Sequence, residues 1–300
     1  MCSSLQRLIK GMFDMWDMIL DCLLDSLKDC LVMLPILFFA YLLMEYVESK
    51  AGEKLNRVVA KVGVAGPALG GLLGAVPQCG FSGAIAGFYA AGLVTLGTLL
   101  SVFLSTSDEM LPILIGNRIA PGEIVKILLF KVIGGIIAGF IIDGVMRLLK
   151  KQRTADSEHI HDFCEQEHCE CEENIWISAL KHTVKVIILI FFVTLAINVV
   201  FEMWGAELFR GIIINVPVLG EALMALIGLI PNCSASVLIT ELYVEGVLGP
   251  GQLIAGLMAN AGVGLLVLFR LNKKVKENLM IVVLLYVCAV ILGVVTSFIW

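Results

Sequence analysis

The chain has 300 residues, of which 59% are hydrophobic and 16% are charged, and its mean hydropathy is +0.96. Soluble domains carry about 25% charged residues, so this composition excludes a soluble globular domain and predicts a membrane protein. The formal net charge of −5 comes with acidic residues that gather in the N-terminal segment and near residue 160. Nucleic acid is therefore not expected as a partner.

The N-terminal segment, residues 1–27, is predicted to form an amphipathic helix. Its apolar residues recur at helical spacing opposite Asp14, Asp17, Asp21 and Asp25, which is typical of a helix lying in the membrane interface. Packing of this helix on other helices is the alternative. No small-residue cleavage site follows a basic start, so we expect no cleaved signal peptide.

Ten apolar segments are separated by glycines, prolines and charge clusters. Several reach the roughly 20 apolar residues that cross a bilayer as a helix, and lipid offers no partner for an unpaired backbone group. The predicted fold is an all-α polytopic membrane protein, with transmembrane units at 28–149 and 178–300 and a polar linker at 150–177. The ten segments are residues 29–47, 62–76, 79–93, 97–117, 122–149, 178–201, 214–230, 233–247, 249–270 and 275–300.

A duplication relates the two units. Pro77-Gln78-Cys79 and Pro231-Asn232-Cys233 are separated by 231 − 77 = 154 residues. A constant offset of this kind indicates an internal repeat. The same offset pairs Ser82 with Ser236, Gly92 with Gly246 and Gly97 with Gly251.

Residues 62–76 and 79–93 are too short to cross the membrane comfortably. As helices they would each reach about 22 Å, against about 30 Å of hydrocarbon. We expect a re-entrant hairpin with Pro77-Gln78-Cys79 at its tip and a second with Pro231-Asn232-Cys233; two short tilted spans are the alternative. Both readings give an odd number of crossings per unit, so the repeats are predicted to be inverted. Inverted repeats with paired short segments are typical of secondary transporters, whose site lies where the repeats meet.

The distribution of basic residues predicts the orientation. Fourteen cluster at 50–61, 147–153, 181–185 and 270–276, against five on the other side. By the positive-inside rule the 150–177 linker is cytoplasmic and both termini are extracytoplasmic. The expected location is the cell membrane, plasma or inner, with the lipid bilayer as a partner.

Gln78, Cys79, Asn232 and Cys233 are the first candidate site residues. An inverted pseudo-two-fold relation would bring two thiols and two amides towards one another. Thiolates favour zinc, copper(I) and, by the same softness, trivalent arsenic, whereas manganese prefers carboxylate and carbonyl oxygen. The alternative is that each cysteine is a small buried hydrophobe.

Polar residues interrupt the next helix of each unit at the same place, with Thr106 in register with Asn260. Such interruptions expose carbonyls and half-helix ends that bind ions, and the mid-span carboxylates Asp108 and Glu109 are candidate ion ligands. Lys131 on the following helix is predicted to lie at the depth of Asp108. A carboxylate that exchanges lysine, proton and cation would couple transport to protons; a static ion pair is the alternative.

The linker contains a cluster of histidines and cysteines whose composition suits borderline and soft metals. Their spacing matches no closed zinc module. A loop that captures metal loosely and an inert tail are both open. The residues are His159, His161, Cys164, His168, Cys169 and Cys171.

The stretches VPQCGFSG at 76–83, STSDE at 105–109, ALKHT at 179–183 and IPNCS at 230–234, with the His/Cys-rich linker, carry a family likeness. Together they resemble the ten-transmembrane heavy-metal exporters, a family whose members are labelled manganese transporters or arsenic efflux proteins. The chain is more distantly similar to organoarsenical permeases, but it lacks their paired Cys-x-Cys, since Gly80 and Phe81 follow Cys79. The resemblance implies export.

The leading hypothesis is a secondary exporter of a heavy-metal cation or metalloid, with a metal ion or metalloid as substrate. No GxxxxGK[ST] element is present and no cofactor is expected. An ion channel shares these features. An intramembrane enzyme is disfavoured because the chain has no HExxH, and because His182, at the start of the 178–201 segment, is expected at the interface and not within the span. A thiol oxidoreductase using Cys79 and Cys233 is the remaining enzymatic alternative. The sequence leaves a monomer and a homo-oligomer both open.

Overall fold

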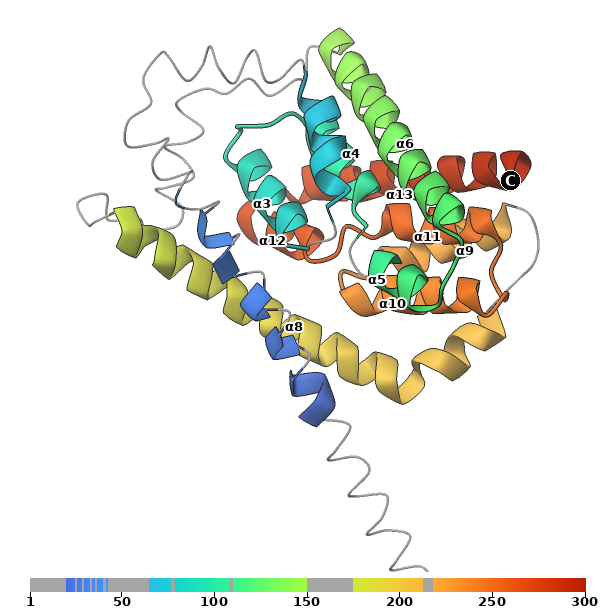
Figure 1. Ribbon diagram of the computed structural model, residues 1–300. Coiled ribbons are helices and arrows are strands. Elements are labelled where there is room, and N and C mark those ends of the chain that lie inside the picture. The colour runs from blue at the N-terminus through green and yellow to red at the C-terminus, as the bar shows by residue number, and fades with distance from the viewer. Residues whose placement is uncertain are drawn as a thin grey trace, which may run out of the picture.

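The computed structural model describes residues 20–42 except 25, 29, 33, 36, 40 and 41, and residues 65–76, 79–107, 110–149, 175–212 and 218–300. All regular structure in these ranges is helical (Figure 1). Besides the helical residues between 20 and 42 and the helix of residues 65–74, the helices are α3 Cys79–Ala90, α4 Leu96–Ser105, α5 Met110–Gly116, α6 Pro121–Leu148, α8 Ile175–Ile212, α9 Leu219–Gly228, α10 Cys233–Val244, α11 Pro250–Ala259, α12 Gly264–Leu271 and α13 Val275–Ile299.

Four helical stretches in the described ranges are long and apolar enough to cross a membrane: Leu96–Gly116, Pro121–Leu148, Pro250–Leu271 and Val275–Ile299. The first and third contain the expected interruptions, since α4 and α5 share one stretch and α11 and α12 the other. The chain is thus a polytopic helical membrane protein. Each of the ten predicted apolar segments contains helix in the described ranges.

The helices of the second half begin a constant distance after those of the first half. The starts of α4 and α11 differ by 250 − 96 = 154 and those of α6 and α13 by 275 − 121 = 154, and the ends of α3 and α10 differ by 244 − 90 = 154. Gly92 and Gly246, also paired by this offset, have φ angles of 76° and 75°, a left-handed conformation that glycine adopts without a steric penalty. The sequence duplication is therefore also a duplication of helix boundaries.

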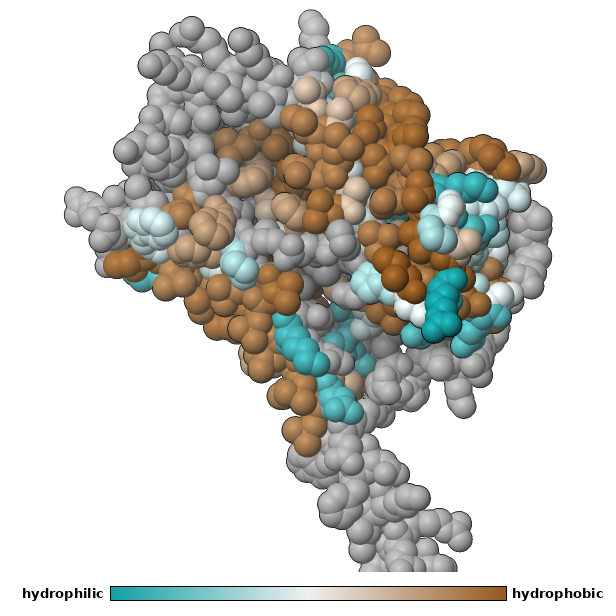
Figure 2. Space-filling view, in the orientation of Figure 1, coloured by the Kyte–Doolittle hydropathy of each residue, from teal (hydrophilic) through white to brown (hydrophobic). Residues whose placement is uncertain are grey.

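Equivalent glycines bring α4 close to α6 and α11 close to α13. A Cβ built on Gly97 would lie 2.1 Å from the carbonyl oxygen of Gly139, and one built on Gly251 would lie 2.7 Å from that of Gly293. Only glycine permits backbones to approach this closely, as small residues do at helix crossings in membranes. The opposite faces of α6 and α13 expose apolar side chains every fourth residue, and Figure 2 shows the hydrophobic surface over α6. These exposed residues are Val125, Leu129, Ile133, Ile137 and Ile141 on α6 and Leu279, Val283, Val287, Ile291 and Val295 on α13.

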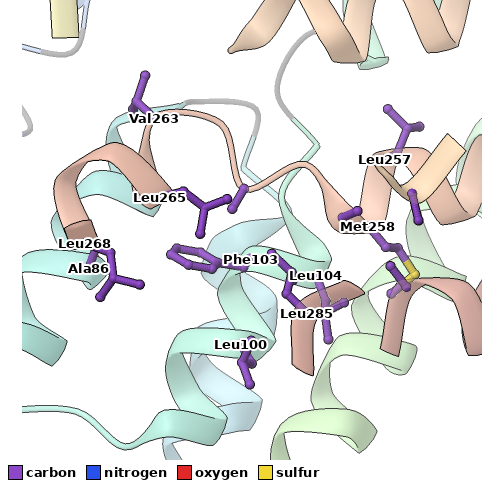
Figure 3. Close-up of a cluster of buried hydrophobic side chains, with 14 of the residues drawn as sticks. Ala86, Leu100, Phe103, Leu104, Leu257, Met258, Val263, Leu265, Leu268 and Leu285 are labelled. Carbon is purple, nitrogen blue, oxygen red and sulfur yellow. The ribbon is translucent and has the colours of Figure 1, made fainter. Parts of the chain in front are cut away.

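The two halves share one core. α3 packs on α12, and reciprocally α10 packs on α5. Figure 3 shows Phe103 of α4 facing Leu265 of α12, with Leu104 and Met258 beside it. All four of these side chains are buried. Apolar burial between the halves therefore fixes α4 against α11 and α12.

The helical residues between 20 and 42 run beside α8 (Figure 1). The Asn198 amide donates to the Ser26 hydroxyl at 3.1 Å, and the rings of Phe38 and Trp176 lie 6.2 Å apart. α8 continues to Ile212, past the predicted end of the apolar segment at residue 201. The end of an apolar segment shows where the chain leaves the hydrocarbon, and a helix continues beyond that point where good helix formers follow. Residues 1–19 of the predicted interfacial helix lie outside the described residues.

Candidate functional site

Both long apolar stretches break at polar residues near their middle. α4 ends at Ser105, and the Thr106 hydroxyl donates to the Val102 carbonyl at 2.7 Å. α11 ends at Ala259, and the Asn260 side-chain oxygen accepts from the Gly262 amide at 2.8 Å. Thr106 and Asn260 are 5% and 3% exposed. We call these two interruptions break 1 (residues 106–109) and break 2 (residues 260–263).

Lys131 of α6 joins the two halves near these breaks. Its ammonium donates to the carbonyl oxygen of Thr106 and lies 3.5 Å from that of Leu257, in the last turn of α11. The side chain is 0% exposed. Carbonyl groups at a helix C-terminus carry partial negative charge, so one buried cation is held by half-helix ends from both units. Thr106, a predicted ion ligand, and Lys131, the predicted coupling residue, are therefore in contact. Asp108, whose depth Lys131 was predicted to share, lies outside the described residues.

Each break also contacts the short helix pair of its own unit. The Ser107 hydroxyl donates to the Ala75 carbonyl at 3.1 Å, just before Pro77. The Asn260 amide donates to the Asn232 carbonyl at 3.3 Å. The structure therefore brings together the two predicted site residues Asn232 and Asn260.

A polar cluster formed by Asn198, Asn232 and Ser234 lies at the second tip. The Asn232 amide donates to the Asn198 side-chain oxygen at 2.6 Å, and the Ser234 hydroxyl donates to the same oxygen at 2.5 Å. The Asn232 side-chain oxygen is buried and accepts no hydrogen bond, which costs free energy unless a ligand supplies a donor or a positive charge. Because Asn232 also contacts break 2, its side-chain oxygen is a candidate ligand for a cation there.

Asn198 and Ser234 were not predicted as site residues. Asn198 stands alone as an amide within the apolar run of 178–201, and polar residues inside spanning segments are functional candidates by default. That signal was available in the sequence. Ser234 carried no signal, because a serine after a helix tip is also an ordinary capping residue.

The remaining predicted site residues are seen only in part. Cys233 begins α10 and is 6% exposed, next to Asn232. Cys79 begins α3, but its side chain, and the residues Gln78, Asp108 and Glu109, lie outside what the structure describes. The linker residues from His159 to Cys171 lie outside it as well. Among the described residues, no group of three or more His, Cys, Asp or Glu side chains could hold a metal ion.

Two carboxylates are buried near the beginnings of α4 and α11. Asp143 accepts from the Thr95 hydroxyl at 2.6 Å and the Gly97 amide at 2.8 Å, so it caps the N-terminus of α4. In the second unit its equivalent is Ser297, which donates to Glu221 of α9 at 2.6 Å. Neither acid was predicted as a site residue, since a single acid near a helix end is usually exposed.

The helices and their breaks define a class, the polytopic helical membrane proteins with discontinuous helices. The family model described as "Putative, 10TM heavy-metal exporter" matches residues 16–220. The chain belongs to this family, as the sequence motifs predicted. No curated protein and no solved structure matches the chain.

Proposed function

We propose that the protein is a secondary transporter that exports a heavy-metal cation or metalloid by alternating access. The family description supports a heavy-metal exporter. The observation that carries the mechanism is the buried Lys131 ammonium, which meets carbonyl oxygens at the breaks of both units. A site formed by half-helix ends from two repeats is typical of such transporters.

An inverted arrangement of the two units is supported by the reciprocal packing. α3 of the first unit meets α12 of the second, and α10 of the second meets α5 of the first. A two-fold relation requires this exchange of partners. The short helices of residues 65–74 and α3 would reach only about 15 and 18 Å, so each pair forms a hairpin that leaves three crossings per unit. An odd number of membrane crossings in the first unit means that the second unit enters the membrane from the opposite side.

The donors near break 2 suggest how a substrate is held. The unfilled Asn232 oxygen and the carbonyls at the end of α11 suit manganese, whereas the Cys233 thiol suits zinc, cadmium or trivalent arsenic. Cys79, Asp108 and Glu109 would complete the set from the first unit. The Lys131 ammonium binds the carbonyl oxygens of Thr106 and Leu257, so a cation that enters to bind the same oxygens would displace it. Loss of a proton from the ammonium would lower the free-energy cost of this displacement.

The orientation follows from the basic residues. Arg270, Lys273, Lys274 and Lys276 flank the junction of α12 and α13, which the positive-inside rule assigns to the cytoplasm. The His/Cys-rich linker would then face the cytoplasm, where it would collect metal for export.

The experiment is metal transport into proteoliposomes under an imposed proton gradient, with manganese, zinc, cadmium, arsenite and antimonite tested in turn. Concentrative transport of at least one substrate supports the exporter, while flux only down the substrate gradient identifies a channel. Loss of soft-metal transport in Cys79→Ser/Cys233→Ser indicates thiol ligation. Proton flux through Asp108→Asn equal to that of the unaltered protein would remove Asp108 from the coupling step. Reversible disulfide formation between the two cysteines without transport would identify an oxidoreductase.

A further inference from the structure

Two tyrosine–glutamate contacts join the units at the helix ends far from the hairpin tips. The Tyr89 hydroxyl, at the end of α3, donates to Glu277 in the first turn of α13 at 2.5 Å. The Tyr243 hydroxyl, at the end of α10, donates to Glu123 in the first turn of α6 at 3.4 Å. The offset 243 − 89 = 154 relates the tyrosines, and 277 − 123 = 154 relates the glutamates. The contacts are therefore equivalent, and each joins one unit to the other.

The two contacts differ in closeness. A hydroxyl donating to a carboxylate at 2.5 Å is a strong charge-assisted bond, whereas 3.4 Å is at the weak limit of hydrogen bonding. Tyr89 is 3% exposed, while Tyr243 is half-buried. Ala91 is also buried where its equivalent Glu245 is exposed, whereas Val94 is partly exposed and its equivalent Leu248 is buried. The Tyr89–Glu277 contact is thus the closer of the two, and its tyrosine is the more buried.

The ends differ in charge as well. Glu277 lies at the α12–α13 junction, whose basic residues are Arg270, Lys273, Lys274 and Lys276. Glu123 lies at the α5–α6 junction, whose nearest basic residues in sequence are Arg118 and Lys126. If the units are inverted, the two contacts lie at opposite membrane faces. A transporter that alternates access needs one face closed while the other opens.

We propose that Tyr89–Glu277 and Tyr243–Glu123 are the gate contacts of this transporter, one at each membrane face, and that they form alternately. This inference rests on the proposed alternating-access function. The structure then represents the state closed at the basic face. In the opposite state, the Tyr243–Glu123 distance shortens and the Tyr89–Glu277 contact separates.

The test is hydrogen exchange of the full-length protein in lipid nanodiscs, read at the ends of α3 and α10 and the first turns of α6 and α13. Tyr89→Phe keeps the ring and removes the donor, so it should raise exchange around residues 89 and 277 and lower it around 243 and 123. Tyr243→Phe should shift the ratio of the two states in the opposite direction. The expected shift for Tyr89→Phe is about tenfold, equal to about 1.4 kcal/mol. In the double variant Tyr89→Phe/Tyr243→Phe, the ratio of the two states should return towards that of the unaltered protein.

Tyr286→Phe is the matched control, because its hydroxyl donates to the Ala222 carbonyl at 3.2 Å within the second unit. Tyr286→Phe should not raise hydrogen exchange at one gate contact while lowering it at the other. Glu277→Gln and Glu123→Gln, which keep an acceptor oxygen, should act with the same signs as their tyrosine partners and a smaller size.

Metal transport by the unaltered protein is measured in parallel. If it transports metal but Tyr89→Phe and Tyr243→Phe each loosen only their own surroundings, or loosen the same face, the gate proposal is overturned. If it moves no metal while the two variants shift exchange in opposite directions, the gate contacts stand and the exporter proposal fails.

Discussion

Replacing Lys131 by methionine should abolish transport while leaving the fold intact. The side chain is 0% exposed, and its ammonium is held by the carbonyl oxygens of Thr106 and Leu257. Losing a hydrogen bond from a charged donor costs about 1.5–3 kcal/mol. Removing the buried charge regains several kcal/mol of desolvation. Because these terms oppose each other, the free energy of unfolding should change by less than about 2 kcal/mol.

The assay combines metal transport in proteoliposomes with thermal unfolding in the same lipid. Leu285→Met is the matched control, since Leu285 occupies the equivalent position of the second unit and is also 0% exposed. This volume-conserving change should cost less than about 1.5 kcal/mol and preserve transport. A loss of about 3–5 kcal/mol in Lys131→Met, as when one partner of a buried ion pair is removed, would make Lys131 half of a static pair. Full transport by Lys131→Met would refute the coupling role.

Three further predictions concern other parts of the chain. Asn232→Ala should weaken metal binding at least about tenfold, or about 1.4 kcal/mol, as measured in equilibrium binding assays. Unchanged binding would exclude the Asn232 side-chain oxygen as a metal ligand. Gly97→Ala should destabilise the protein by about 1–3 kcal/mol in thermal unfolding, because its Cβ would lie 2.1 Å from the Gly139 carbonyl, whereas Gly144→Ala, with nothing within 4 Å, should not. Replacing every His and Cys of residues 159–171 by serine should preserve transport at high metal concentration but reduce metal uptake from dilute solution. If the same replacements leave metal binding by the isolated linker peptide unchanged, the linker does not capture metal.

Local sequence patterns were sufficient for the helices and their breaks. Apolar length predicted the spanning stretches, and the polar residues at Thr106 and Asn260 predicted where α4 and α11 end. The offset of 154 residues predicted that the second half would repeat the first, and α4 and α11, like α6 and α13, begin 154 residues apart. These features depend on short-range hydrogen bonding and on hydropathy, both of which are written in adjacent residues.

Other features depended on how the helices cross. That Lys131 meets the carbonyl of Leu257, and that Asn198 joins Asn232, follow from the packing of α6 on α4 and of α8 beside the second tip. The reciprocal Tyr89 and Tyr243 contacts likewise require the two units to be placed against each other. Contacts between residues of different helices are set by which faces pack together, and no local pattern encodes that choice. The sequence by itself determined the repeated parts, and the tertiary structure decided which of their polar residues meet.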